Sequence, residues 1–430
     1  MIAGLIGFAV LLGLCFAGLP LAFSMILVGA AGLTLVRGFE PAMLVVSQQA
    51  IDWSTSYGLT VLPMFILMGT LVHHARLADD LFAAANAWMG HRRGGLAMAT
   101  ISASAGLAAV SGTSLATAAI MSKVSIPAMR RYGYSDALAA GSCAAGGCLG
   151  ILIPPSVPMV IYGILTETDI GKLFIAGIIP GLLLTMMYIL SIAVKVHLDP
   201  AAAPRGERMP WSERLRLLGA TWAILVLALV VLGGIYIGVF TPTEAAGIGA
   251  GGALLFALAR GKLTRRILWD ALIEAGRTTS TVFMVGIGAL VFAKFVTLVG
   301  MTGAMVAWIE SLNAPPMGVV IAMCVIYLVL GCVFESLGML LLTVPVFYPI
   351  VHAMGIDPIW FGIIVIIVVE IGLITPPVGI NVFVVKGLFR EIPLWTIYGG
   401  IMPFLIGNLV CLAILLALPG LVTFLPNLMR

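Results

Sequence analysis

The chain has 430 residues, of which 61% are hydrophobic and only 9% are charged, and its formal net charge is +4. Soluble domains carry about 25% charged residues, so this composition excludes a soluble enzyme. Because a helix of roughly 20 apolar residues crosses a bilayer and satisfies its own backbone hydrogen bonds, we expect an all-α polytopic membrane protein. The uncharged runs long enough for a crossing are 1–36, 53–75, 94–122, 137–166, 173–194, 217–243, 311–334 and 392–429.

The first half of the chain, 1–196, is expected to contain full spans and one re-entrant hairpin. The mixed apolar and charged segment 77–93 suits a helix in the membrane interface or, alternatively, an ordinary loop. Residues 95–132 hold two apolar stretches around Ser111-Gly112-Thr113-Ser114, and each is short for a full crossing. They predict a helical hairpin with its tip near mid-membrane. The full spans are expected near 3–17, 19–36, 58–74, 136–165 and 172–196.

A polar stretch rich in arginine and proline, 197–216, indicates a linker between two halves. The second half, 217–430, shows the same order of features. Its interfacial segment is expected at 261–275, and its hairpin at 317–354 with Glu335-Ser336-Leu337-Gly338 at the tip. Full spans are expected near 217–238, 242–260, 276–298, 358–388 and 395–420.

The two halves repeat each other at an offset of 222 residues. Ser114 maps to Ser336, Gly150 to Gly372, and Pro154-Pro155 to Pro376-Pro377 at this offset. The alternative is chance matching in a chain rich in glycine and proline. Five full spans and one hairpin make an odd number of crossings per half. The halves must then be oppositely oriented, which is the inverted-repeat architecture of secondary transporters, here with about ten full spans and two hairpins.

The positive charges predict which side of the membrane each end occupies. If the N-terminus is outside, most basic residues fall in the cytoplasm, including Arg92-Arg93, Arg130-Arg131 and Arg265-Arg266, whereas few, such as Arg37 and Lys172, fall outside. Cytoplasmic loops carry an excess of Lys and Arg. We therefore predict a periplasmic N-terminus, a first hairpin that opens to the cytoplasm and a second that opens to the opposite face.

Two double prolines interrupt expected spans, at Pro154-Pro155 within 136–165 and at Pro376-Pro377 within 358–388. Proline removes a backbone donor and clashes with the preceding turn, so two in a row should unwind a helix. Unwound carbonyls with neighbouring hydroxyls suit Na⁺, and the new helix N-termini suit a carboxylate. The alternative is a pair of kinks that only shape packing. Since both breaks occur at one repeat offset, we favour a binding site formed by paired broken helices.

Charged side chains within membrane spans are costly and usually functional. Glu335, at the second tip, is expected to attract a cation or to gate, or alternatively to accept hydrogen bonds from the backbone N–H groups of the following arm. Glu370 is open to structural pairing or to gating. Lys123 and Lys294 are expected to extend toward the membrane surfaces. The sequence shows no membrane-buried Asp/His chain for proton relay, which favours Na⁺ over H⁺ coupling.

Several other functions are excluded by missing motifs. The sequence has no Walker A motif, so ATP-driven transport by this chain alone is not expected. It has no basic, aromatic-interleaved stretch that would indicate nucleic-acid binding. A membrane-embedded enzyme would need a buried catalytic cluster such as HExxH or a Ser/His/Asp set, and the sequence contains none.

Taken together, these motifs resemble one family, the large membrane subunit of tripartite ATP-independent periplasmic (TRAP) transporters, typified by C4-dicarboxylate and sialic acid permeases. The resemblance covers essentially the whole chain. Gly338 departs from it, since a small polar residue or alanine is expected at the second tip. The matching stretches are Leu62-Pro63-Met64-Phe65 with Gly69, Ser111-Gly112-Thr113-Ser114, Gly150 through Ser156, Thr241-Pro242-Thr243-Glu244-Ala245-Ala246, Glu335-Ser336, Pro345 and Thr375-Pro376-Pro377-Val378-Gly379-Ile380-Asn381.

The resemblance implies an elevator-type secondary transporter in the bacterial inner membrane, driven by two or more Na⁺ and without an organic cofactor. It implies two protein partners, a small membrane subunit and a periplasmic solute-binding protein that delivers a small organic acid. By analogy the first Na⁺ site would use Ser111, Ser114, Gly150, Ile153 and Ser156. The second would use Gly331, Gly372, Thr375 and Val378. The substrate would lie between the tips, near Thr113, Pro155, Ser336 and Asn381.

The main alternative is a stand-alone carboxylate transporter of a related inverted-repeat family, coupled to Na⁺ or H⁺ and needing no binding protein. The two hypotheses differ in partners, so co-purification of a small membrane subunit would favour the first.

Overall fold

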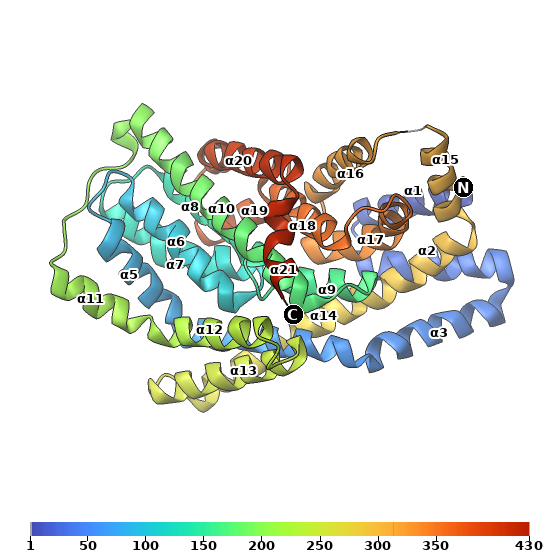
Figure 1. Cartoon of the computed structure of the whole chain (residues 1–430), viewed down its shortest axis with the longest axis horizontal. Coiled ribbons are helices and arrows are strands. Elements are labelled where there is room, and N and C mark those ends of the chain that lie inside the picture. Colours follow the sequence, from blue (N-terminus) through green and yellow to red (C-terminus); the bar gives the residue numbers. More distant parts are fainter. Residues whose placement is uncertain (1, 313, 430) are drawn as a thin grey trace.

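The computed structural model describes residues 2–312 and 314–429 and is built mainly of helices (Figure 1). Within this range the only pairing of the strand type is an isolated antiparallel bridge between Arg93 and Arg205. The prediction of an all-α protein is therefore confirmed.

The first half of the chain folds into helices α1 to α10. The helix α3 was not among the expected spans, because Glu40, Gln48 and Asp52 make its sequence polar. Segment 77–93 does contain a helix, α5, rather than an ordinary loop. The bounds are α1 (Ile2–Phe16), α2 (Leu21–Arg37), α3 (Phe39–Thr55), η1 (Tyr57–Thr60), α4 (Val61–His74), α5 (Leu77–Met89), α6 (Gly95–Ser111), α7 (Ser114–Arg131), α8 (Asp136–Leu152), α9 (Val157–Thr166) and α10 (Ile170–Leu198).

The second half folds into helices α11 to α21. Helix α14 corrects the sequence interpretation, since most of the expected interfacial segment 261–275 continues into the expected span 276–298 as one helix of 34 residues. No proline interrupts it, and at 1.5 Å per residue it is about 51 Å long. The bounds are η2 (Pro200–Ala202), α11 (Trp211–Ala220), α12 (Trp222–Tyr236), α13 (Pro242–Ala259), α14 (Arg265–Leu298), α15 (Met301–Ser311), α16 (Pro316–Gly331), α17 (Ser336–Ala353), α18 (Pro358–Ile374), α19 (Ile380–Leu388), α20 (Leu394–Ala417) and α21 (Gly420–Leu428).

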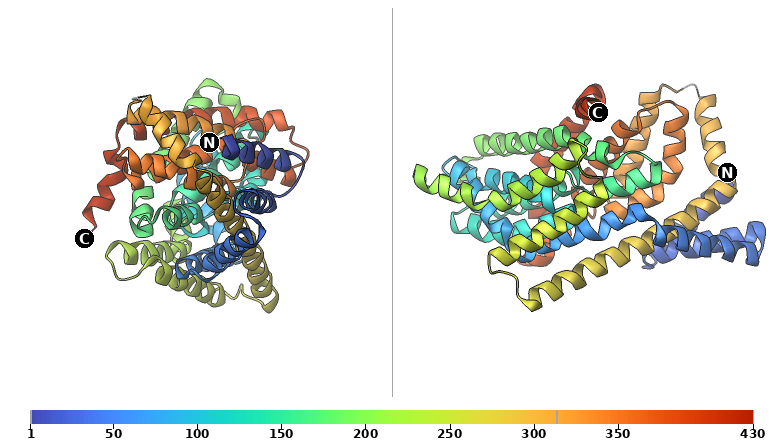
Figure 2. Two further views of the ribbon diagram at one scale, coloured as in Figure 1. Left: turned by 90° about the vertical axis from the view of Figure 1, so that its right-hand side faces the viewer. Right: turned by 60° about the horizontal axis from the view of Figure 1, so that its bottom comes forward.

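The helices of the two halves correspond closely. Adding 222 to the bounds of α7 and α8 gives the bounds of α17 and α18, and the counterparts of α2 and α5 are α13 and α15. Helices α3 and α4 together correspond to the single helix α14, which packs against both of them and runs along the molecule beside the N-terminal helices (Figure 2).

The described helices differ in whether they are long enough to cross a membrane. Among the described residues, seven helices are long and apolar enough to cross a membrane, or eight if α11 and α12, bent by 48°, count as one span. The sequence predicts about ten, and this number is not confirmed. The helices α1, α2, α6, α16 and α18 are apolar but only 15 to 17 residues long.

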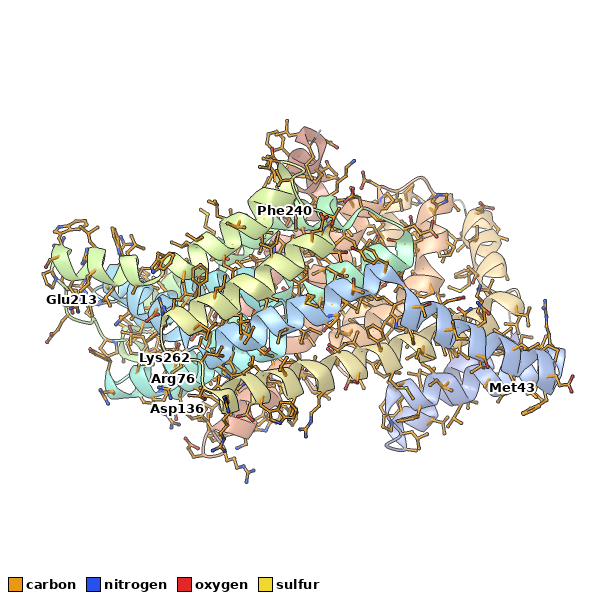
Figure 3. The ribbon with its side chains drawn as sticks, turned by 90° about the horizontal axis from the view of Figure 1, so that it is seen from below. Met43, Arg76, Asp136, Glu213, Phe240 and Lys262 are labelled. Atoms are coloured by element: carbon orange, nitrogen blue, oxygen red, sulfur yellow. The ribbon has the colours of Figure 1, made fainter. Side chains whose placement is uncertain are left out.

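The connection between the halves lies at one end of the molecule. The predicted linker 197–216 is partly helical, because α10 continues to Leu198 and α11 begins at Trp211. The middle of the linker is hydrogen-bonded to two neighbouring connections between helices. Gly206 N donates to Gly90 O (3.1 Å), and Ser135 N donates to Ala202 O (3.0 Å). Arg76, Asp136, Glu213 and Lys262 gather toward this end, and Met43 lies at the opposite one (Figure 3).

Helices α8 and α18 form the centre of the molecule. Every residue of 138–152 and of 360–374 is buried. Helix α8 is enclosed by α6, α7, α10, α18 and α20. Apolar side chains on outer helices, such as Leu229 of α12 and Val325 of α16, are exposed instead, as expected for surfaces that face lipid.

Glycine allows α8 and α20 to cross closely. A Cβ added at Gly400 would overlap the Ala137 carbonyl, and one added at Gly141 would overlap Gly400. The neighbouring Gly399 has open space around its Cβ position. The two adjacent glycines therefore form a matched pair for testing this contact.

We predict that Gly400→Ala destabilises the protein by about 1–3 kcal/mol, because the added methyl group overpacks the helix crossing. The measurement is the apparent Tm of the purified protein in detergent. Gly399→Ala is the control and should leave the Tm nearly unchanged. Equal Tm values for both variants would contradict the crossing.

Candidate ion and substrate site

Both double prolines interrupt helices where the sequence predicts it. Helix α8 ends at Leu152 and α9 begins at Val157, whereas α18 ends at Ile374 and α19 begins at Ile380. Each break contains a cis Pro–Pro peptide bond. The first break is largely buried, while Pro377 of the second is exposed. At both breaks the backbone groups of irregular chain are therefore not paired within a continuous helix.

The first hairpin tip rests directly on the first break. The turn between α6 and α7 uses Gly112 with φ of +66°, a conformation that favours glycine. A Cβ added there would lie 3.1 Å from the Pro155 carbonyl oxygen, and Val157 N donates to Gly112 O (3.2 Å). The break thus supplies a donor to a tip carbonyl.

Hydroxyl groups line the inner side of this tip. The Ser111 and Thr117 hydroxyl oxygens are 2.8 Å apart, and Thr117 Oγ1 donates to Thr113 O (2.9 Å). A Cβ added at Gly150 would lie 2.5 Å from that same Thr113 oxygen, so only glycine lets α8 approach the tip. Sequence reasoning missed Thr117; its position one turn after Thr113 on the hairpin arm was the available signal.

Asn381 connects the second break to the first hairpin. Its side chain is fully buried, and its Nδ2 donates to Ser114 Oγ (2.7 Å) and to Ala144 O (3.3 Å). The same Ser114 hydroxyl is 3.1 Å from Asn381 Oδ1, so its proton can satisfy that oxygen. A residue assigned to the substrate and one assigned to the first Na⁺ site are therefore direct partners. Among the other predicted substrate residues, Thr113 lies between Gly112 and Ser114 at the first tip, and the Pro155 carbonyl faces Gly112.

The second tip is organised by the Glu335 carboxylate. It accepts from Ser336 Oγ (3.1 Å) and lies 3.5 Å from Gly338 N, and so caps the N-terminus of α17. This is the structural role that the sequence leaves open for Glu335. Packing also explains why position 338 is glycine, because a Cβ there would lie 2.5 Å from the Leu21 side chain of α2. Ser336 is buried, and its hydroxyl bonds to Glu335 rather than to the other predicted substrate residues.

The residues assigned to a second Na⁺ site are close together at the second break. A Cβ added at Gly372 would lie 2.6 Å from Gly331 Cα, so α16 and α18 touch through backbone. Thr375 N donates to Gly372 O (3.2 Å), and the Thr375 hydroxyl donates to Ile371 O. The Tyr398 hydroxyl of α20 lies 2.7 Å from both the Pro377 and the Val378 carbonyl oxygens. Tyr398 was not predicted, since its counterpart at the repeat offset is Ala176.

Glu370 lies between the two breaks. The Cys148 thiol is 3.5 Å from the Glu370 carbonyl oxygen, and these two residues are 222 apart, so equivalent positions of the two halves meet here. The Glu370 carboxyl is fully buried and lies beside the backbone N–H groups of Ile151 and Leu152 at the end of α8. Structural pairing and gating therefore both remain predictions for Glu370.

The chemistry of these groups suits a hard monovalent cation. They offer backbone carbonyls and hydroxyl oxygens, which are hard ligands. No group of three or more His, Cys, Asp or Glu residues that could hold a metal is present in residues 2–312 and 314–429. The two breaks therefore provide oxygen donors.

Comparison with known proteins places the whole chain in one group. A family model described as the DctM component of the tripartite ATP-independent periplasmic transporter matches residues 8–421. The C4-dicarboxylate TRAP transporter large permease protein DctM of Pseudomonas aeruginosa is 37% identical over 403 residues, covering 93% of each chain. The sialic acid TRAP transporter large permease protein SiaM of Vibrio cholerae is 34% identical, covering 97% of each.

Two further similarities concern a longer relative and the fold. The isethionate TRAP transporter permease protein DctMQ of Oleidesulfovibrio alaskensis is 32% identical, and the match covers 86% of this chain but 58% of that protein. The crystal structure of the Alcanivorax borkumensis YdaH transporter superposes with a TM-score of 0.66 over 89% of each chain. At 15% sequence identity, this second similarity supports the fold alone.

We predict that Asn381→Ala and Ser114→Ala are coupled, because each leaves the partner's buried polar group unsatisfied at a cost of about 1–3 kcal/mol. The measurement is a double-mutant cycle on apparent Tm. The double variant should lose less stability than the two single variants together, with a coupling of about 0.5–3 kcal/mol. Additive losses would show that the bond contributes nothing.

Proposed function

The chain belongs to the family of the DctM component of tripartite ATP-independent periplasmic transporters, and on that premise we propose that it is the large permease subunit of a Na⁺-coupled importer of a small organic carboxylate. The observation that carries this proposal is the pair of broken helices, each placed beside oxygen donors at matching positions of the two halves. Two relatives are named as a C4-dicarboxylate permease and a sialic acid permease, so these compounds are the first substrate candidates.

The proposed first Na⁺ site uses Ser111, Ser114 and the carbonyls of Gly150, Ile153 and Ser156. The proposed second site uses Gly331, Gly372, Thr375 and Val378. Two bound Na⁺ would offset the charge of a dicarboxylate, and a bare charge in the membrane costs several kcal/mol. Support comes from the contact of Gly150 with the first tip, from the contact of Gly372 with Gly331, and from the oxygen chemistry of the breaks.

The substrate would lie between the hairpin tips, near Thr113, Pro155, Ser336 and Asn381. Because Asn381 and Ser114 bond to each other, substrate and the first Na⁺ would compete for the same two side chains or exchange partners with them. Glu335 would act mainly by capping α17 and would gate only if that cap opened. This arrangement links ion binding to the geometry of the substrate site.

The proposed movement is an elevator motion of the hairpins and broken helices within a scaffold of outer helices. The matched helix bounds support an inverted repeat, with the N-terminus in the periplasm of an inner-membrane protein. Arg130 pairs with Asp136 (2.7 Å) and Glu391 (2.6 Å), which joins the bases of the first hairpin and of both broken helices. This brace supports the idea that these elements move as one body.

Two partners complete the proposed transporter, a small membrane subunit and a periplasmic solute-binding protein. The isethionate permease DctMQ supports the small membrane subunit as a partner, because it is longer than this chain and this chain matches only part of it. The binding protein would select the substrate, so its ligand identifies what is imported. The direct experiment is reconstitution of the three proteins in liposomes; uptake that needs all three and a Na⁺ gradient supports the proposal, and uptake by this chain alone contradicts it.

We predict that Thr375→Ala weakens Na⁺-dependent uptake, with a several-fold higher Na⁺ concentration for half-maximal rate, while membrane insertion is unchanged. Removing the hydroxyl takes one oxygen donor from the proposed second site. The control is Thr297→Ala on α14, whose hydroxyl makes the same bond to the carbonyl four residues earlier (2.8 Å). An unchanged Na⁺ dependence of Thr375→Ala in proteoliposomes would rule out this ligand.

A further inference from the structure

Two adjoining cavities lead from one end of the molecule to the first hairpin tip. The outer cavity, about 550 Å³, lies among residues of α4, α5 and α7 that include His74, Arg76 and Asp79. The inner cavity, about 200 Å³, reaches Ser111 and Thr113 at the tip. Both cavities share His73, Ile120 and Lys123 in their linings. Lys123 therefore stands where they meet.

One face of α7 forms the wall of the inner cavity. Thr113, Ala116, Ile120 and Lys123 recur at intervals of three and four residues, which places them on one side of a helix. The small side chains of Thr113 and Ala116 leave room for a ligand near the tip. Ten residues at 1.5 Å per residue separate Thr113 from Lys123 by about 15 Å. This distance makes the cavity a path rather than one binding site.

The charged residues along this path are basic Arg76 and Lys123 and acidic Asp79 and Glu274, and Lys123 is the one at the junction of the two cavities. Lys123 is exposed and forms no ion pair or hydrogen bond with any described residue. Glu274, the acidic residue of the inner cavity, is bonded to His74 (3.0 Å). The fold of a hairpin arm does not require a lysine here, because the counterpart of Lys123 in α17 is Pro345.

We propose that these cavities form an exit path to the cytoplasm and that Lys123, at their junction, attracts the carboxylate of the substrate in transit. The inference rests on the proposed function and orientation. An ammonium on a flexible stem is a point charge that suits weak, passing contact better than a fixed two-point grip. A positive charge beside a cavity raises the local concentration of anions there.

The proposal is tested by charged thiol reagents on cysteines placed inside the path. In Ala116→Cys protein, inside-out membrane vesicles receive an anionic or a cationic methanethiosulfonate, and mass spectrometry of the peptide containing residue 116 gives each rate. The anionic reagent should react faster than in a Lys123→Gln background, where the ratio of anionic to cationic rates should fall by about 3-fold or more. High salt should shrink this difference.

The controls separate the path from general effects of charge. Lys294→Gln removes an exposed lysine of α14 that lines neither cavity, and it should leave the ratio unchanged. Ala119→Cys provides a second reporter if Ala116→Cys folds poorly. Reaction only from the periplasmic face, or a ratio that ignores Lys123→Gln, would overturn the proposal. Since labelling needs neither Na⁺ nor uptake, its outcome is independent of the transport assay.

Discussion

The structure depends on one constraint, which is that backbone polar groups inside a membrane must find partners within the protein. Continuous helices meet it by themselves, but the two breaks cannot. The first break meets it through the hairpin tip, where Val157 N donates to Gly112 O. The second meets it through the Tyr398 hydroxyl, which reaches the Pro377 and Val378 carbonyls. The first tip and the first break therefore stabilise each other, and the Tyr398 hydroxyl stabilises the second break. The irregular chain for which we propose ion binding depends on these contacts.

Close backbone contact is the second requirement, and glycine provides it at each critical position. Gly150 lets the first tip approach α8, and Gly372 lets α18 touch Gly331. Any side chain at these positions would separate the oxygen donors that the proposed Na⁺ sites combine. Gly150 and Gly372 match each other at the repeat offset. Glycine therefore serves close helix contact in both halves, which is compatible with a helical membrane protein. Packing and proposed binding thus depend on the same residues.

The sequence was sufficient for features set by local chemistry. The double prolines located both breaks. The repeat offset of matching Ser, Gly and Pro residues anticipated that α7 and α8 correspond to α17 and α18. Polar composition hid α3, and a weak amphipathic signal divided α14 into two elements. The pairing of Asn381 with Ser114 joins residues 267 apart, and no local pattern encodes it. Tyr398 was missed for the same reason. Its hydroxyl bonds to the break in another part of the chain, and neither a repeat nor a motif marks such a contact in the sequence.

The central claim is that Na⁺ binding at the broken helices drives carboxylate import. The most direct measurement is the simultaneous flux of radioactive sodium and labelled substrate into proteoliposomes that contain this chain with its two proposed partners. The account predicts that Na⁺ enters with each carboxylate in a fixed ratio of at least two, since two sites are proposed. Substrate uptake without accompanying Na⁺ would contradict it.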